Sequence, residues 1–258
     1  MPRIRGQPNL WPVGKHIIIV GGVSVNDKGG HDAYPYNFIN PAVARAKLYK
    51  TDVTILVFAP PYRKRVTDQV TEHSQVAYSW AYECHLPFVS TASCPDMFKS
   101  KSKNPDHFLN VLVTAAGKHG AKVVLLEKKD DLTNQLIALK PIETVDYFGH
   151  SNATGMFLQY STTGSTSPAG EVVWREADAA KVAAGSVTGS FTSFGCNQGD
   201  SGGLAEQLAK LWNIKAVGSD GKTDYGPIGQ GQPQPSSANG YFSYPPGGAG
   251  RSAVPGRP

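Results

Sequence analysis

Two residues with reactive side chains, His150 and Cys196, each follow a short hydrophobic block that ends in glycine. The block before the histidine reads VDYFG, and the block before the cysteine reads SFTSFG. A thiol must lose its proton before it attacks a carbonyl carbon, and a neighbouring imidazole is a common base for that step. The residue types therefore indicate nucleophilic catalysis, with Cys196 as nucleophile and His150 as general base and acid, if the fold brings them together.

The elements that would position these residues alternate between strands and helices. Short apolar runs rich in β-branched residues predict six buried strands, over 15–22, 52–60, 121–128, 145–150, 186–196 and 214–218. Helical patterns are expected over 40–48, 66–80, 105–117, 132–139, 176–184 and 203–213, and a hairpin between 156–160 and 171–174. This order favours an α/β fold with a mainly parallel sheet of about six strands. Because ligands bind at the carboxyl ends of such strands, His150 and Cys196 would share one edge if their strands are neighbours.

The two blocks, together with the segment GLAEQLAKLWNIKAVGSDG after the cysteine, resemble the caspase-like (clan CD) cysteine peptidases. That superfamily includes caspases, legumains, gingipains and the self-processing protease domains of bacterial toxins, and the likeness is closest to the toxin-type and gingipain-like members. In it the histidine closes one strand and the cysteine closes the next core strand. The resemblance implies a caspase-like three-layer sandwich over 15–226, with helices on both faces of the sheet. It also implies peptide-bond hydrolysis through an acyl-enzyme on Cys196, a protein or peptide substrate, and no cofactor.

The same resemblance assigns the groups that would stabilise the oxyanion. They are the backbone amides of Cys196 and of a residue near Ser151, with Gly149 beside them. The superfamily usually has glycine where Ser151 stands, so here a serine amide would have to donate. Losing one such donor typically lowers the rate by about 10²–10³-fold.

Substrate recognition is expected at the same edge of the sheet. Asn26 and Asp27 follow the first predicted strand, and Ser219, Asp220 and Asp224 follow the sixth. An acidic residue there could select a basic residue before the scissile bond, and Asp220 is the preferred candidate. The alternative is that these residues only form turns, which is common for Asp and Gly in a stretch such as GSDGKTDYG.

Two other interpretations of the chain stay open. One is a binding module of the same fold whose dyad is inert. The other rests on strings that resemble trypsin-like serine peptidases, namely GDSGG at 199–203 and IVGG at 19–22, with His85 and Asp131 preceding Ser201. That family consists of two antiparallel barrels, whereas GDSGG here runs into the helical pattern LAEQLAKLW. The cysteine reading instead predicts a glycine-rich loop in which Asp200 or Ser201 caps the next helix.

Composition limits the remaining classes of function. The chain of 258 residues has a formal net charge of +5 and three cysteines, an odd number that favours a reducing compartment over a disulfide framework. No apolar run is long enough for a membrane span, and no signal peptide is visible. These features suggest a cytoplasmic location, or export without a cleavable signal.

The clusters of basic residues in the chain lack a nucleic-acid-binding motif, and no metal site is expected. Residues 1–14 are expected to form an arm, and the Gly/Pro-rich residues 227–258 an extended arm or a disordered tail.

Overall fold

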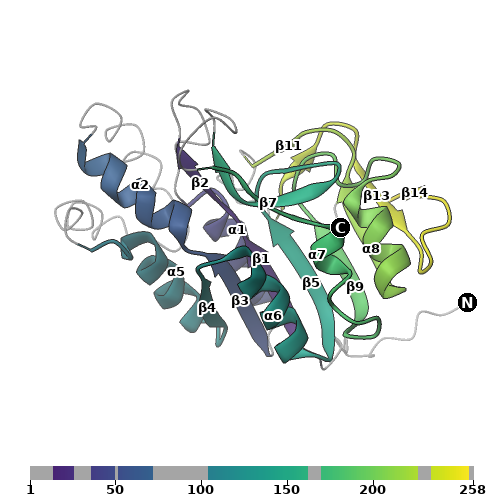
Figure 1. Cartoon of the computed structure of the whole chain (residues 1–258), viewed down its shortest axis with the longest axis horizontal. Helices are drawn as coiled ribbons and strands as arrows, with labels where there is room; N and C mark the ends of the chain where they lie inside the picture. Colours follow the sequence, from purple (N-terminus) through teal and green to yellow (C-terminus); the bar gives the residue numbers. More distant parts are fainter. Residues whose placement is uncertain are drawn as a thin grey trace, which may run out of the picture.

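A computed structural model describes residues 14–25, 36–49, 52–71, 104–161, 170–225 and 234–255. Its main feature is an eight-stranded sheet with the order β14-β13-β10-β9-β5-β1-β3-β4 (Figure 1). The strands, in chain order, are β1 (His16–Val20), β3 (Val53–Phe58), β4 (Lys122–Leu126), β5 (Ile142–Phe148), β9 (Val187–Ser193), β10 (Lys215–Ser219), β13 (Tyr241–Tyr244) and β14 (Ser252–Ala253). The six strands from β10 to β4 pair in parallel and are the six that the sequence predicts. The mixed α/β class with a mostly parallel sheet is therefore confirmed.

The strand β1 shows how the sheet divides the core. All five residues of HIIIV are buried. Successive side chains of a strand point to opposite faces, so Ile18 and Val20 join one apolar cluster while Ile17 and Ile19 join the other. The first cluster contains residues of α1 (Ile39–Tyr49), α2 (Pro60–Thr71) and α5 (His107–Gly117). The second contains residues of α6 (Lys129–Leu139), α7 (Glu176–Ala179) and α8 (Leu204–Trp212).

Three helices differ from their predicted ranges by three or more residues at one end. α2 begins at Pro60, six residues before the predicted start, because proline suits the first helical position. α6 begins at Lys129, since the Asp131 carboxylate accepts hydrogen bonds from the amides of Glu127 and Lys128 and so closes the first turn. α7 is a single turn, shorter than the predicted 176–184.

A second, smaller sheet lies directly after His150. It comprises β2 (Gly22–Val25), β6 (Ser151–Asn152), β7 (Gly155–Ser161) and β8 (Val172–Arg175). The predicted hairpin is present as the antiparallel pair β7–β8. The predicted strand 15–22 is instead two strands, because at Gly21 the chain leaves β1 and continues as β2, which pairs in parallel with β7. A side chain at Gly21 would clash with the carbonyl of Phe157, 2.3 Å from the position of its Cβ.

The prediction of an arm or disordered tail from residue 227 is wrong for the part that the structure describes. Residues 234–255 form β12 (Ser236–Ser237), β13 and β14. β13 pairs antiparallel with β10, and its Tyr241 and Tyr244 are buried. The sheet therefore has eight strands instead of about six, and residue 226 does not end the folded domain. The Gly/Pro-rich composition concealed a strand of only four residues, YFSY. Within the described residues, no helix is long and apolar enough to cross a membrane.

Candidate active site at the ends of β5 and β9

The chain leaves β5 and β9 at the same edge of the sheet, and His150 and Cys196 follow these two neighbouring strands within three residues. The two strands are parallel neighbours in which Tyr147 pairs with Ser193, and the Phe194 amide just after this pair donates a hydrogen bond to the Tyr147 carbonyl at 2.9 Å. The Ser151 hydroxyl donates a hydrogen bond to the Cys196 carbonyl at 2.7 Å. Gly195 packs so closely that a Cβ there would lie 2.2 Å from the Ser151 hydroxyl oxygen. The two backbones therefore touch at the point where the reactive side chains begin.

The sulfur of Cys196 lies against the loop that follows β10. Cys196 is a free, half-buried thiol. Its Sγ accepts a hydrogen bond from the backbone amide of Thr223 at 3.3 Å and lies 3.4 Å from the Thr223 hydroxyl oxygen. Thr223 belongs to β11 (Thr223–Asp224), which pairs with β12. Sequence reasoning missed Thr223, although it chose Asp224 next to it. An amide and a hydroxyl facing the sulfur supply donors that an anionic sulfur could use.

The imidazole of His150 contacts two aromatic rings from other elements. Phe38, just before α1, meets the ring edge-on with centroids 5.2 Å apart, and Tyr160 of β7 lies at 4.3 Å with a tilt of 33°. The His150 carbonyl accepts hydrogen bonds from the Phe157 amide and the Tyr147 hydroxyl. The backbone and the ring of His150 are therefore both held by neighbouring groups. The contact with Phe38 carries no signal in the sequence, because this residue is far from His150 along the chain.

Tyr225 joins the ends of the two strands. Its hydroxyl accepts a hydrogen bond from the Gly149 amide at 3.3 Å and donates one to the Phe194 carbonyl at 3.0 Å. Burial, with smaller contributions from Tyr241, Tyr147 and Cys196, raises the pKa of Tyr225 well above the ordinary tyrosine value, so it keeps its proton and its donor role. The Gly149 amide, which was expected beside the oxyanion, thus already has a hydrogen-bond partner in this structure.

The other two predicted oxyanion donors stay candidates. The Cys196 amide has no hydrogen-bond partner among the described residues. The bond from the Phe157 amide to the His150 carbonyl makes residues 150 and 157 a hydrogen-bonded pair. The next pair, Ser151 and Met156, is then a non-hydrogen-bonded one, so the Ser151 amide points away from β7.

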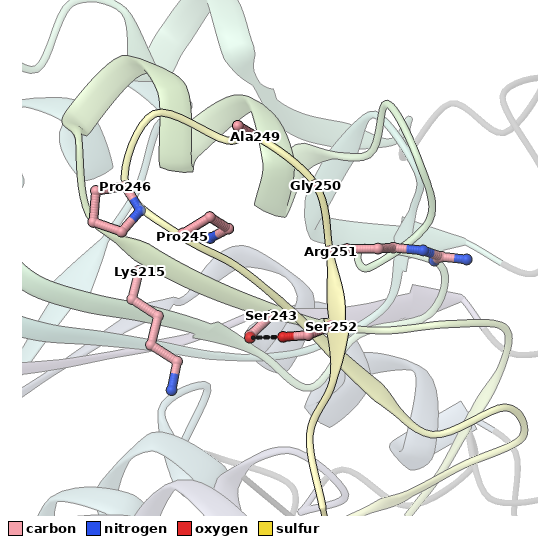
Figure 2. Close-up of a pocket in the computed structure, with 8 residues that line it drawn as sticks. All are labelled: Lys215, Ser243, Pro245, Pro246, Ala249, Gly250, Arg251 and Ser252. Carbon is pink, nitrogen blue, oxygen red and sulfur yellow. Dashed lines mark hydrogen bonds between the residues drawn. The ribbon is translucent and has the colours of Figure 1, made fainter.

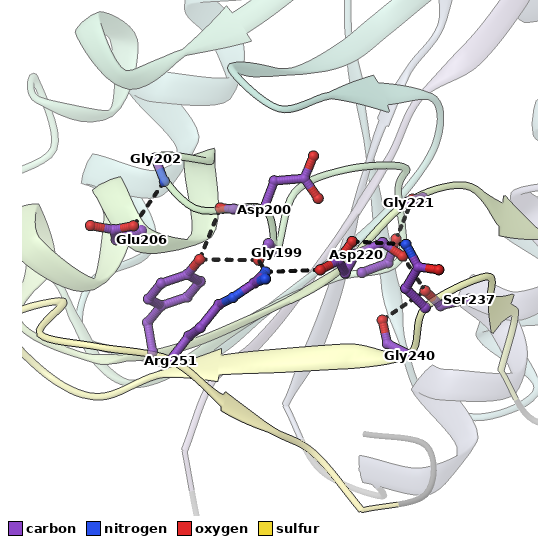
Figure 3. A network of polar contacts seen from close by, with 12 residues as sticks. Gly199, Asp200, Gly202, Glu206, Asp220, Gly221, Ser237, Gly240 and Arg251 are labelled. Carbon is purple, nitrogen blue, oxygen red and sulfur yellow. Dashed lines mark hydrogen bonds and ion pairs between the residues drawn. The ribbon is translucent and has the colours of Figure 1, made fainter.

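The predicted substrate-binding residues have different surroundings from those expected. The Asp220 carboxylate accepts hydrogen bonds from Arg251 at 2.9 Å and from the Asn239 side chain at 3.1 Å (Figure 3). A carboxylate so occupied does not support selection of a basic substrate residue. Ser219 is completely buried and donates to the Gly221 carbonyl.

Asp224 is the one predicted recognition residue in the described chain that is exposed. It follows Thr223 in β11, and side chains alternate along a strand, so it points away from the sulfur. Asn26 and Asp27 lie outside the described residues.

The serine alternative finds no support in the described residues. Ser201 is exposed in the turn before α8, and Asp131 is occupied at the start of α6, while His85 lies outside the described residues. The prediction that Asp200 or Ser201 caps α8 is also wrong, because the N-cap is Gly203. The first two helical amides donate instead to the carbonyls of Ala153 and Gln198. The turn β6–β7 is thereby tied to the segment after Cys196.

A groove of about 420 Å³ lies elsewhere, on the outer strands β13 and β14 (Figure 2). It includes Lys215, the first residue of β10, which is at the opposite end of that strand from the candidate site. In Figure 2 the Arg251 side chain points away from the other lining residues. We therefore assign the groove no part in the chemistry. Among the described residues, no group of three or more His, Cys, Asp or Glu could hold a metal ion.

Comparison with known proteins adds no assignment. The chain matches no protein-family model, and no curated protein is significantly similar to it.

Proposed function

We propose that the protein is a cysteine peptidase in which Cys196 is the nucleophile and His150 the general base and acid. The observation that carries the proposal is that β5 and β9 are neighbouring parallel strands, with His150 two residues after the end of β5 and Cys196 three residues after the end of β9. The bond from the Ser151 hydroxyl to the Cys196 carbonyl holds the two chain segments together at that point.

The arrangement can perform acyl transfer in two balanced steps. His150 takes the thiol proton as Sγ of Cys196 bonds to the carbonyl carbon of the substrate, and the amides of Cys196 and Ser151 face the developing oxyanion. The C–N bond then breaks, and the imidazolium gives its proton to the leaving amine. In the second step His150 takes a proton from water, the water oxygen bonds to the acyl carbon, and the C–S bond breaks. The thiol regains its proton and the product is a carboxylic acid.

The caspase-like resemblance and this geometry support each other. The resemblance requires the histidine and the cysteine to close adjacent core strands, and β5 and β9 are adjacent. It also requires a helix and a strand after the nucleophile, a place that α8 and β10 take. We propose a caspase-like three-layer sandwich on this basis, extended by β13 and β14 at the edge beyond β10. Asp220 is not part of the proposed substrate site, because Arg251 pairs with it.

The test combines a peptide library with active-site variants. We expect the wild-type protein to cleave a subset of the peptides, and Cys196→Ala and His150→Ala each to lower turnover on the order of 10⁴-fold or more. Ser201→Ala should retain turnover. If only the Ser201 variant loses activity, the nucleophile is Ser201 and not Cys196.

Thiol labelling separates an enzyme from an inert binding module. Limited reaction with iodoacetamide, read by peptide mass spectrometry, should modify Cys196 faster than Cys84 or Cys94. His150→Ala should remove that advantage, since the imidazole activates the thiol in our proposal. If Cys196 reacts no faster than the other two cysteines and no peptide is cleaved, the peptidase proposal fails.

A further inference from the structure

We propose that Arg251 is a positioning residue for the nucleophile, acting from the C-terminal segment through the two loops that hold Cys196. This inference rests on the proposed function, because it concerns the geometry of the same site. Arg251 lies 55 residues after Cys196 and is far from it in the sequence. Its role depends on contacts that only the folded chain creates.

Two loops surround the sulfur of Cys196. The segment 197–203 follows Cys196, and the segment 219–224 carries Thr223, which contacts Sγ. The two are joined by hydrogen bonds from the Asn197 amide to the Gly221 carbonyl and from the Gly199 amide to the Ser219 carbonyl, both 2.8 Å. The position of the sulfur relative to Thr223 therefore depends on how these loops sit against each other.

The guanidinium of Arg251 contacts both loops. Arg251 Nη1 donates to the Gly199 carbonyl at 2.8 Å and lies 2.9 Å from the Asp220 carboxylate (Figure 3). The guanidinium also stacks on the Phe242 ring, 4.2 Å from its centroid. The Tyr244 hydroxyl lies 2.8 Å from the Asp200 carbonyl oxygen and 3.0 Å from the Gly199 carbonyl oxygen, so the hydrogen bond it donates fixes the same loop from β13. Each of the two loops thus has a contact with Arg251, and the β13–β14 hairpin anchors the arginine.

Arginine is well suited to contact both loops from position 251. A planar guanidinium can donate to a carbonyl and a carboxylate while its face rests on an aromatic ring, which a lysine ammonium does not reproduce. The side chain is 33% exposed, so small solutes can reach its site. Without Arg251, the Asp220 carboxylate would lose its cation and the Gly199 carbonyl one of its donors. We expect the loops to shift relative to each other and the sulfur to leave its place beside Thr223.

The experiment measures the steady-state cleavage of a library-derived peptide and the rate of Cys196 alkylation by iodoacetamide. We expect Arg251→Ala to lower kcat and the alkylation rate roughly 10- to 100-fold, with KM changed less, because small displacements of reacting groups cost about that much. Adding methylguanidinium chloride at millimolar concentration should restore part of both rates, whereas sodium chloride at equal ionic strength should not. A loss caused only by weaker folding would not respond to methylguanidinium in this way.

Arg63→Ala is the matched control. Arg63 is 31% exposed and pairs with Asp106 and Glu127, at the opposite edge of the sheet beside β4. Its removal should leave both rates within about twofold of the wild type, as for a surface pair worth at most about 1 kcal/mol. If Arg251→Ala is poorly folded, Arg251→Gln provides the same measurement with a smaller loss of contacts.

The outcomes separate this inference from the proposed function. If the wild-type protein neither cleaves peptides nor shows rapid Cys196 alkylation, the peptidase proposal fails. If the wild type is active and the folded Arg251 variants match the Arg63 control, Arg251 has no positioning role and only this inference is overturned. A loss of rate in the Arg251 variants that methylguanidinium does not relieve would also overturn it.

Discussion

Replacing Tyr225 with phenylalanine tests whether one hydroxyl holds the ends of β5 and β9 together. The residue is 3% exposed, and its hydroxyl bonds to the Gly149 amide and the Phe194 carbonyl. Phenylalanine keeps the ring in place but leaves a buried N–H and a buried C=O without that partner. Each such group typically costs about 1–3 kcal/mol. We therefore expect the free energy of unfolding to fall by about 2–6 kcal/mol, a substantial part of the roughly 5–15 kcal/mol usual for a domain.

Urea unfolding followed by tryptophan fluorescence measures this loss. The midpoint should fall while the dependence on urea concentration stays the same, since the surface exposed on unfolding hardly changes. Tyr62→Phe is the control, because Tyr62 is also buried but donates a single hydrogen bond, to the Gly21 carbonyl at 2.7 Å. It should lose about 1–2 kcal/mol.

The Tyr225 and Tyr62 variants should also differ in their effect on function. Tyr225→Phe should lower peptide turnover and Cys196 alkylation in the folded protein, because the ends of the two strands become free to separate. Tyr62→Phe should leave both rates close to those of the wild type. A Tyr225→Phe protein that is destabilised by less than about 0.5 kcal/mol, or no more than the Tyr62 variant, would refute the bridging role.

Two further predictions concern stability. Removal of residues 227–258 should yield an aggregating or unfolded protein, because β10 loses its partner β13 and becomes an exposed edge; a soluble truncated protein with the wild-type thermal transition would contradict this. Asp178→Asn should destabilise the protein at neutral pH. Burial opposes the charge of Asp178, but the hydrogen bonds from Lys129 and from the Arg175 amide, with the nearby Lys181, outweigh it and lower the pKa of the carboxyl. Because the folded pKa is below the unfolded one, this stabilisation is present above the ordinary aspartate pKa of about 3.9 and is lost as the pH falls through the folded value. The gap between wild type and variant in urea midpoints should therefore close in acid, and a gap that stays constant with pH would count against the ion pair.

Local pattern was sufficient for the six parallel strands of the sheet, but not for β13 and β14. The runs HIIIV and VTILVF are buried on both faces, as central parallel strands are, so an uninterrupted apolar run between polar or glycine residues identified them. The same pattern placed His150 and Cys196 at the ends of two predicted strands, which in the structure end slightly earlier, at Phe148 and Ser193. What it could not provide was the order of strands, which brings those two ends together. The burial of a strand can be inferred from its own sequence, whereas the identity of the strand beside it depends on how the whole chain packs.

The surroundings of the site were decided by the tertiary structure alone. Tyr225 bonds to Gly149, 76 residues away, and Arg251 to Gly199, 52 residues away, so no window of sequence contains both partners. The sequence favoured Asp220 as the partner of a basic substrate residue. Its partner in the structure is Arg251, which lies in a segment whose glycines and prolines predicted a tail. Residue types and local periodicity therefore determined which groups could react and which elements carry them. Which of these groups already have hydrogen-bond or ion-pair partners depended on long-range contacts, because such bonds form between whatever side chains the packed core brings within reach.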